Sequence, residues 1–118
     1  MMSKTFPTLA LLATLGLSGP SFADEKFEET LLQAKKGDAQ AQAEVGVMYA
    51  KGRGTRQDYV SAFIWMSAAK ANGDRASAQN LQNLRKRMSL QEIVDGQAQA
   101  GRCIGSHYQH CKSSRPMY

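Results

Sequence analysis

Two short motifs recur along this chain at a spacing in the mid-thirties, and that spacing restricts the folds the chain can adopt. A Gly-Asp pair occurs at Gly37 and Asp38 and recurs 36 residues later at Gly73 and Asp74. An Ala-Gln pair occurs at 41–42 and recurs 37 residues later at 78–79. A repeat of this length made of two helices indicates a helical-hairpin solenoid, whose units must stack because one hairpin cannot bury its apolar face alone.

The sequence between positions 24 and 104 favours helices throughout. It is rich in Ala, Gln, Leu, Lys and Met and has little two-residue alternation, which predicts an all-α chain of antiparallel hairpins stacked as a short α/α solenoid. Expected helices cover about 24–36, 39–51, 58–72, 74–88 and 89–104. Their expected apolar faces are Phe27, Leu31 and Ala34; Ala41, Val45, Met48 and Tyr49; Tyr59, Ala62, Phe63, Met66 and Ala69 with Trp65 alongside; Ala78, Leu81, Leu84 and Met88; and Ile93, Gln97, Ala100 and Ile104.

Capping residues mark the expected helix starts. The predicted N-caps are Asp24, Asp38, Asp58, Asp74 and Ser89, the last in a capping box with Glu92. Gly46, in the middle of the second helix, indicates close approach of a neighbouring helix.

The segment KGRGT at 51–55 is glycine-spaced and basic, like a loop that binds phosphate. A Walker-type loop needs a strand before it and its lysine at the start of the next helix, whereas here a helix precedes the loop and the lysine comes first. We therefore expect a turn in which Gly52 ends one helix in a left-handed conformation and Gly54 permits the reversal toward the next.

The second and third helices, with this loop, resemble the Sel-one-like repeat family, a relative of the tetratricopeptide repeats. The residues that match the family pattern are Gly37, Asp38, Ala41, Gln42, Gly46, Tyr49, Gly52, Gly54, Asp58, Ala62, Trp65, Ala69 and Gly73. Val45, Thr55 and Lys70 depart from it, and the stretch LRKRMSLQEI resembles the terminal unit of bacterial members. The resemblance implies a full repeat at about 37–73, a degenerate terminal repeat at 74–104, a concave face, and work as a protein–protein adaptor.

The first 23 residues have the features of a cleavable signal peptide. Lys4 precedes the apolar run PTLALLATLGL, and Ser21 and Ala23 are small residues at the positions a signal peptidase reads. The run is shorter than the roughly 20 residues of a transmembrane helix, and an uncleaved N-terminal anchor is the alternative. We expect a periplasmic or secreted protein whose mature chain starts at Asp24 and has no membrane span.

Charge is distributed unevenly after that cleavage. Residues 24–58 carry 6 basic and 7 acidic side chains, and residues 59–118 carry 8 basic and 3 acidic. Arg85, Lys86 and Arg87 form the densest basic run, which could attract an anionic polymer or surface or could simply be a solvated helix face. Aromatic residues do not alternate with the basic ones, so no specific nucleic acid is expected.

Cys103 and Cys111 are the only two cysteines of the chain. In an exported protein a close pair predicts a disulfide, which would fold residues 105–118 into a cap and tail. The alternative is a zinc site formed with His107 and His110. The spacing does not match a known zinc finger, and an oxidising compartment favours the disulfide.

No group of residues in the sequence points to catalysis. The acids mostly occupy expected helix starts and the two histidines lie in the expected cap, so we predict no enzyme, cofactor, metal or small-molecule substrate. The first helix of each pair should line a shallow groove that suits an acidic or polar peptide. Its candidate residues are Gln40, Ala43, Val47, Lys51, Asn80, Asn83 and Arg87. Two functions stay open: an envelope adaptor that binds a protein, and a small basic protein that binds an anionic polymer.

Overall fold

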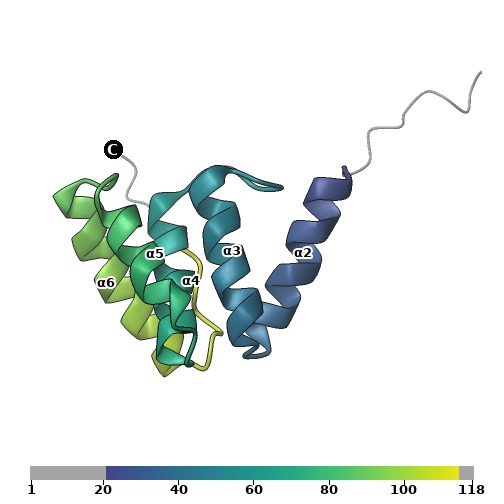
Figure 1. Cartoon of the computed structure of the whole chain (residues 1–118). Coiled ribbons are helices and arrows are strands. Elements are labelled where there is room, and N and C mark those ends of the chain that lie inside the picture. Colours follow the sequence, from purple (N-terminus) through teal and green to yellow (C-terminus); the bar gives the residue numbers. More distant parts are fainter. Residues whose placement is uncertain (1–20, 115–118) are drawn as a thin grey trace, which may run out of the picture.

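The structure is a computed structural model, and it describes residues 21–114. This part of the chain forms five helices and no strand, which confirms the all-α prediction (Figure 1). The helices are α2 (Phe22–Lys35), α3 (Ala39–Lys51), α4 (Tyr59–Ala71), α5 (Ala76–Arg85) and α6 (Leu90–Gly105). The predicted signal segment lies outside the described residues except for its last three positions.

Helix α4 is the centre of the molecule. It packs against α3, α5 and α6, while α2 packs against the other side of α3. Helix α2 therefore lies at one end of the row, and α5 and α6 lie at the other (Figure 1). Nine of the 13 residues of α4 are buried. Because three helices surround α4, burial extends around most of its circumference, beyond the single face that the sequence predicts.

Two glycines permit the close contacts that α4 makes with its neighbours. A Cβ atom on Gly46 would lie 2.6 Å from Cγ of Met66 and 3.3 Å from the carbonyl oxygen of Ala62. A Cβ atom on Gly96 would lie 2.8 Å from Cδ1 of Phe63. Helices α3 and α6 reach α4 this closely because neither glycine carries a side chain. The packing role predicted for Gly46 is confirmed, and Gly96 plays the same role in α6.

The core forms two clusters on two sides of α4. The first joins α2, α3, α4 and both cysteines and includes Trp65; the second joins α4 and α5 and includes Phe63. Tyr49 packs against both clusters. Its ring also meets Phe27 edge to face, with ring centroids 5.2 Å apart. Tyr49 and Trp65 thus share one cluster.

The predicted N-caps of α3, α4 and α6 are confirmed. The Asp38 carboxylate accepts a hydrogen bond from the Ala41 amide at 2.9 Å, and the Asp58 carboxylate accepts from the amides of Val60 and Ser61 in the first turn of α4. Ser89 and Glu92 form the expected capping box. Each of these caps satisfies amides that the first turn of a helix leaves without a partner.

The caps predicted for α2 and α5 are wrong. Helix α2 starts at Phe22 and is capped by Ser21, and Asp24 is the third-position partner in that capping box. A serine three residues before an acid supplies both halves of the box, so the helix begins further upstream. Helix α5 starts at Ala76, with Arg75 in the N-cap position and no side-chain cap. Asp74 lies one residue earlier, where its carboxylate accepts from the amide and hydroxyl of Ser77.

The face of α6 that packs on α4 also differs from the expected one. Its buried residues are Gly96, Gln99, Ala100 and Cys103, whereas Gln97 and Ile104 are exposed and Ile93 is half-buried. The packed face is therefore rotated by about one residue from the predicted stripe. Gly96 and the bridged Cys103 fit against α4 where larger apolar side chains would not.

The KGRGT segment is a turn, as predicted. Gly52 is the C-cap of α3 with φ of 70°, and Gly54 has φ of 72°, so both occupy the left-handed region that glycine tolerates best. The turn also reaches α2, because a Cβ atom on Gly54 would clash with the Ala23 carbonyl and lie 2.9 Å from Cβ of Phe27. This segment therefore helps to position α2 beside α3.

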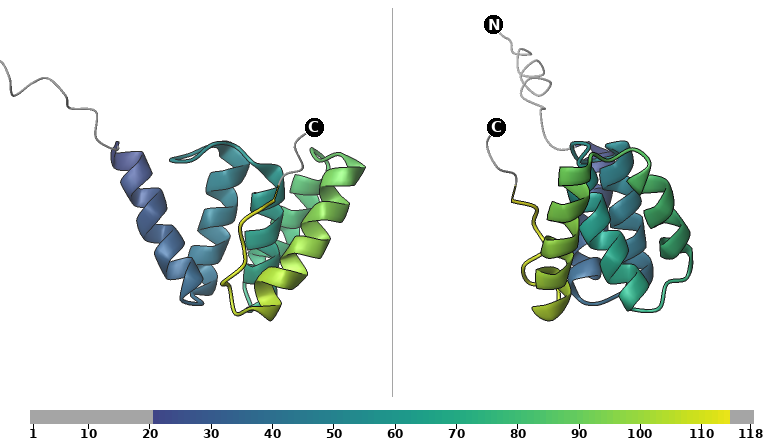
Figure 2. Two further views of the ribbon diagram at one scale, coloured as in Figure 1. Left: turned by 180° about the vertical axis from the view of Figure 1, so that it is seen from behind. Right: turned by 90° about the vertical axis from the view of Figure 1, so that its left-hand side faces the viewer.

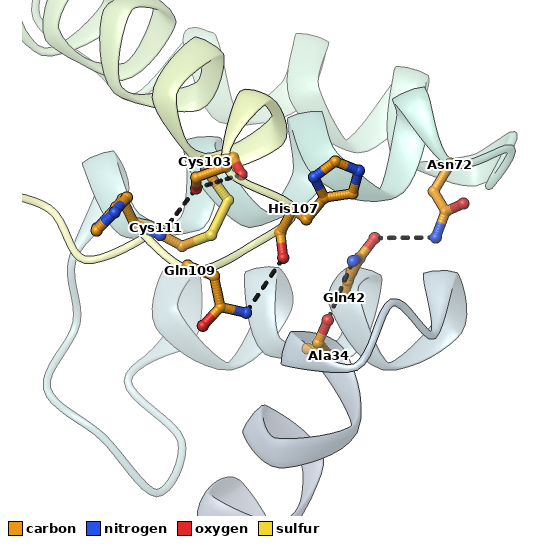
Figure 3. The surroundings of a disulfide bond; sticks show 9 residues. Ala34, Gln42, Asn72, Cys103, His107, Gln109 and Cys111 are labelled. Atoms are coloured by element: carbon orange, nitrogen blue, oxygen red, sulfur yellow. Dashed lines mark hydrogen bonds between the residues drawn. A yellow bond between two sulfur atoms is a disulfide. The ribbon is translucent and has the colours of Figure 1, made fainter.

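Residues 106–114, which we call the C-terminal strap, fold back from the end of α6. A disulfide joins Cys103 to Cys111, and both cysteines are buried in the first core cluster (Figure 3). The Ser113 hydroxyl donates to the Asp58 carboxylate at 2.9 Å, and the Ser114 amide donates to Oε1 of Gln99 at 2.8 Å. The strap is thus tied to the start of α4 and to the buried face of α6.

Candidate functional site

A groove between α3 and α5 brings together most of the predicted binding residues. Its volume is about 300 Å³, at the lower end of the range for ligand pockets. The lining residues are Val47, Ala50, Lys51, Tyr59, Met66, Asn80, Asn83, Leu84 and Arg87. We call it the α3/α5 groove.

Helical spacing explains which side chains line the two walls. On α3, Val47 and Lys51 are four residues apart and share a face. On α5, Asn80 and Asn83 are three residues apart, and Arg87 follows one turn later, just past the end of the helix. The walls therefore offer an aliphatic side chain, two amides and two cations.

The floor of the α3/α5 groove is apolar and belongs to the core. Met66 from α4 and Leu84 from α5 are 3% and 4% exposed, and both belong to the second cluster. Gly46 lies directly against Met66, so the same glycine that brings α3 onto α4 also fixes the depth of the groove beside it. These side chains pack against the second core cluster below the groove.

The charge of the α3/α5 groove is positive. Lys51 and Arg87 are exposed on opposite walls, and no acidic residue in the described part of the chain lines the groove. The half-buried Tyr59 and the side-chain amides of Asn80 and Asn83 add groups that can donate and accept hydrogen bonds. An anionic or polar extended segment is the ligand chemistry that such a surface fits.

Two of the predicted residues lie outside this groove. Gln40 lines a separate hollow between α2 and α3 that also contains acids, among them Glu29, Asp38 and Glu44. Ala43 is half-buried and lines neither. The other five, Val47, Lys51, Asn80, Asn83 and Arg87, converge.

Four lining residues were not among the predicted binding residues. The sequence predicts Tyr59, Met66 and Leu84 only as members of apolar core faces, and it carries no signal for Ala50. Helical spacing places Tyr59, Met66 and Leu84 on apolar faces. Which part of such a face lines a groove depends on how α5 packs on α4. The half-buried tyrosine at the first position of α4 is the one signal that could have pointed to the groove.

The basic run at 85–87 does not form one continuous patch. Arg87 lines the α3/α5 groove, whereas the Arg85 guanidinium lies over the Phe63 ring, 5.7 Å from its centroid, on the side of α5 that faces α6. Lys86 is exposed between them. The helix therefore directs these charges to two different surfaces.

Tyr49 is a titratable side chain that packs against both core clusters. Burial raises the pKa of the Tyr49 phenol above its ordinary value of 10.0, and the nearby carboxylates Asp58 and Glu28 raise it further. At neutral pH this phenol is fully protonated and cannot act as a base.

The predicted alternative of a zinc site requires two free thiolates, and the disulfide between Cys103 and Cys111 removes both.

Within residues 21–114, no three His, Cys, Asp or Glu side chains are grouped so that they could hold a metal ion. No helix in that range is long and apolar enough to cross a membrane. Comparison of the chain with protein-family models, curated proteins and solved structures gave no match.

Proposed function

We propose that this chain is an exported, non-enzymatic helical-repeat adaptor that binds an acidic or polar segment of a protein partner in the α3/α5 groove. The observation that carries the proposal is the convergence of Val47, Lys51, Asn80, Asn83 and Arg87 on one groove with an apolar floor and no acidic lining residue among those described. An oxidising compartment such as the cell envelope is consistent with the disulfide.

Several features support membership of the Sel-one-like repeat family and a solenoid of stacked pairs. Gly37 and Gly73 have the same φ of 98° in the turns that precede α3 and α5. The Asn72 amide in the second turn donates to the Gly37 carbonyl in the first at 2.6 Å, which holds the two turns together. In this proposal α3 with α4 is the full repeat, α5 with α6 is the degenerate one, and α2 is the last helix of an incomplete unit.

Recognition would combine one apolar contact with charge-assisted hydrogen bonds. An apolar side chain of the partner would lie on Met66 and Leu84, and carboxylates on either side of it would meet Lys51 and Arg87. The amides of Asn80 and Asn83 are placed to bind the peptide backbone. A groove this small gives weak affinity for a single segment, so a partner with several such segments would bind best.

The proposal is tested with a panel of short peptides that carry one apolar residue between aspartates or glutamates. Their binding to the purified protein is measured by calorimetry. We expect the double change Lys51→Gln and Arg87→Gln to weaken binding about tenfold, which corresponds to about 1.4 kcal/mol. The matched control is Lys86→Gln, because Lys86 is also exposed but lines no wall of the groove. Equal affinity of the double variant and the control would refute the groove as the binding site.

The alternative function is binding of an anionic polymer through the basic C-terminal half. The exposure of Arg85, Lys86 and Arg87 favours it, but their divergence onto two sides of α5 favours the groove. Polymer binding should fall steeply as salt rises, because it releases counterions. Retention of binding to a phosphorylated polysaccharide after all three residues are changed to Gln would eliminate this alternative.

A further inference from the structure

A second groove lies between α5 and α6, at the end of the molecule opposite α2. Both helices pack on α4, at the end of the molecule that faces the viewer in Figure 2 (right). The space between them measures about 460 Å³. Its lining comes from all three helices: Phe63, Ser67, Lys70 and Ala71; Leu81 and Arg85; and Gln97, Ala100, Gly101 and Ile104. We call it the α5/α6 groove.

The α5/α6 groove combines an apolar floor with two cations. Phe63 is buried at its base, Leu81 is half-buried, and Ile104 is 37% exposed at its edge. The ammonium of Lys70 and the guanidinium of Arg85 are exposed beside these residues, and no acidic side chain of residues 21–114 lines the groove. This surface needs an occupant that has an apolar side chain next to carboxylates.

The outward face of α2 has that complementary chemistry. Glu25, Glu29 and Leu32 follow the spacing i, i+4 and i+7, which places them on one side of the helix. The residues that α2 buries, Phe27 and Ala34 among them, face the other way, and Leu32 is 53% exposed. Of the nearby lysines, Lys26 follows Glu25 and borders the hollow between α2 and α3, and Lys35 and Lys36 lie at the end of the helix. Leu32 and Glu25 therefore point away from the molecule, and Glu29 lies at the edge of this face, where it also borders the hollow between α2 and α3.

We propose that copies of this chain associate head to tail, with the outward face of α2 of one copy seated in the α5/α6 groove of the next. Leu32 would contact the apolar floor, and Glu25 and Glu29 would pair with Lys70 and Arg85. The two surfaces lie at opposite ends of the row of helices, so each copy can use both at once (Figure 1).

The charges also determine the symmetry of this association. A contact of α2 with α2 would bring carboxylates together, and a contact between two α5/α6 grooves would bring cations together. A contact between unlike surfaces is heterologous, and it leaves one free surface of each kind on every pair. The association therefore continues into short chains of molecules or closes into a ring. It leaves the α3/α5 groove open, because that groove lies on the other side of α5.

Sedimentation velocity of the protein purified after expression from its full-length gene tests this proposal. We expect the mean mass to rise with concentration at low salt and to fall as salt is added, because the pairs are exposed. The double change Glu25→Gln and Glu29→Gln should weaken association at least about tenfold. The double change Lys70→Gln and Arg85→Gln should do the same.

Mixing these two double variants gives the decisive measurement. The variant altered at Glu25 and Glu29 retains an intact α5/α6 groove, and the variant altered at Lys70 and Arg85 retains an intact α2 face. Together they should form a one-to-one complex that grows no further. The matched controls are Glu44→Gln and Lys86→Gln, which are exposed charges outside both surfaces and should leave association unchanged. Helical content, measured by circular dichroism, should be the same in every variant because all the altered side chains are exposed.

Three results would overturn the proposal. The first is a protein that stays monomeric at every concentration, and the second is association that survives both double variants. The third is a mixture of the two variants that shows no complex. Each result is independent of peptide binding in the α3/α5 groove, so the two proposals can fail separately.

Discussion

Helices α4 and α5 lie against each other but serve opposite purposes. Helix α4 buries Val60 through Met66 without interruption, whereas α5 buries only Ser77 and Leu84. The sequence of α4, YVSAFIWMSAAKA, is apolar on all sides, and that of α5, ASAQNLQNLR, is mostly amide and small side chains. A helix surrounded by three neighbours stabilises the fold, and a helix seated on one neighbour leaves grooves along both of its edges.

This comparison separates stability from recognition. Substitutions in α4 and in the residues packed against it should change the free energy of unfolding. Substitutions of the groove-lining amides of α5, Asn80 and Asn83, should change binding and leave that free energy nearly unchanged. The following predictions test the separation, from the largest expected effect to the smallest.

Trp65→Ala should cost about 3–5 kcal/mol of unfolding free energy, because the side chain is 2% exposed in the first core cluster. Leu81→Ala in α5 should cost about 1 kcal/mol or less, because its side chain is only half-buried. Urea denaturation followed by circular dichroism measures both. Similar losses in the two variants would show that α5 contributes to the core as much as α4 does.

Removal of the disulfide should have the next largest effect. Changing Cys103 and Cys111 together to Ser should cost about 2.5 kcal/mol on the chain-entropy model, because the bridge closes a short loop. Burial of the new hydroxyls would add to that cost. Thermal unfolding of the double variant, compared with wild-type protein under reducing and oxidising conditions, is the measurement. A wild-type protein that is equally stable in both conditions would contradict a structural role for the bridge.

Two glycine substitutions should change stability in opposite directions. Gly46→Ala should destabilise by about 1–3 kcal/mol, because its Cβ atom would overlap Met66 and press on the backbone of α4. Gly101→Ala in α6 should stabilise by about 0.5–1 kcal/mol, because nothing lies within 4 Å of the added atom and alanine favours the helix. Denaturation midpoints of the two variants give the sign directly, and equal signs would show that helix propensity outweighs packing at Gly46.

The smallest effect should appear only in alkali. The raised pKa of Tyr49 means that the folded state holds its phenol proton more tightly than the unfolded chain does. That contribution is fully present below the unfolded pKa of about 10 and is lost as the pH rises through the folded pKa. Tyr49→Phe should therefore make stability less sensitive to pH above about 10 than it is in wild-type protein. Parallel curves from neutral pH to alkaline pH would mean that Tyr49 is already solvated.

Local signals allowed the sequence to predict much of the fold. Asp38, Asp58 and Ser89 each cap the helix that follows them, and Gly52 ends α3, because capping depends on a few adjacent residues. The start of α2 was missed because the expected cleavage after Ala23 removed Ser21 from consideration. The orientation of α6 was missed because it depends on Phe63, a residue of another helix that lies against Gly96.

For the α3/α5 groove, too, the sequence predicts which residues share a face of one helix but not how the helices pack on each other. Val47 with Lys51, and Asn80 with Asn83 and Arg87, could be predicted as stripes because each set follows helical spacing on its own helix. The two stripes face each other across Met66 because of the position of α5 on α4. No sequence pattern within either helix specifies that position. The second groove was not predicted, since it exists only because α5 and α6 both pack on α4.

The attachment of the C-terminal strap to Asp58 has a consequence for the order of events during folding. Asp58 caps α4 and also accepts a hydrogen bond from Ser113, which is 55 residues later in the chain. Helices α3 and α4 are joined by a short turn and can pair early, because nearby segments meet at low entropic cost. The strap can attach only after the start of α4 has formed and α6 has docked. The last residues of the strap are therefore expected to become ordered last, completing a fold that the α3–α4 hairpin begins.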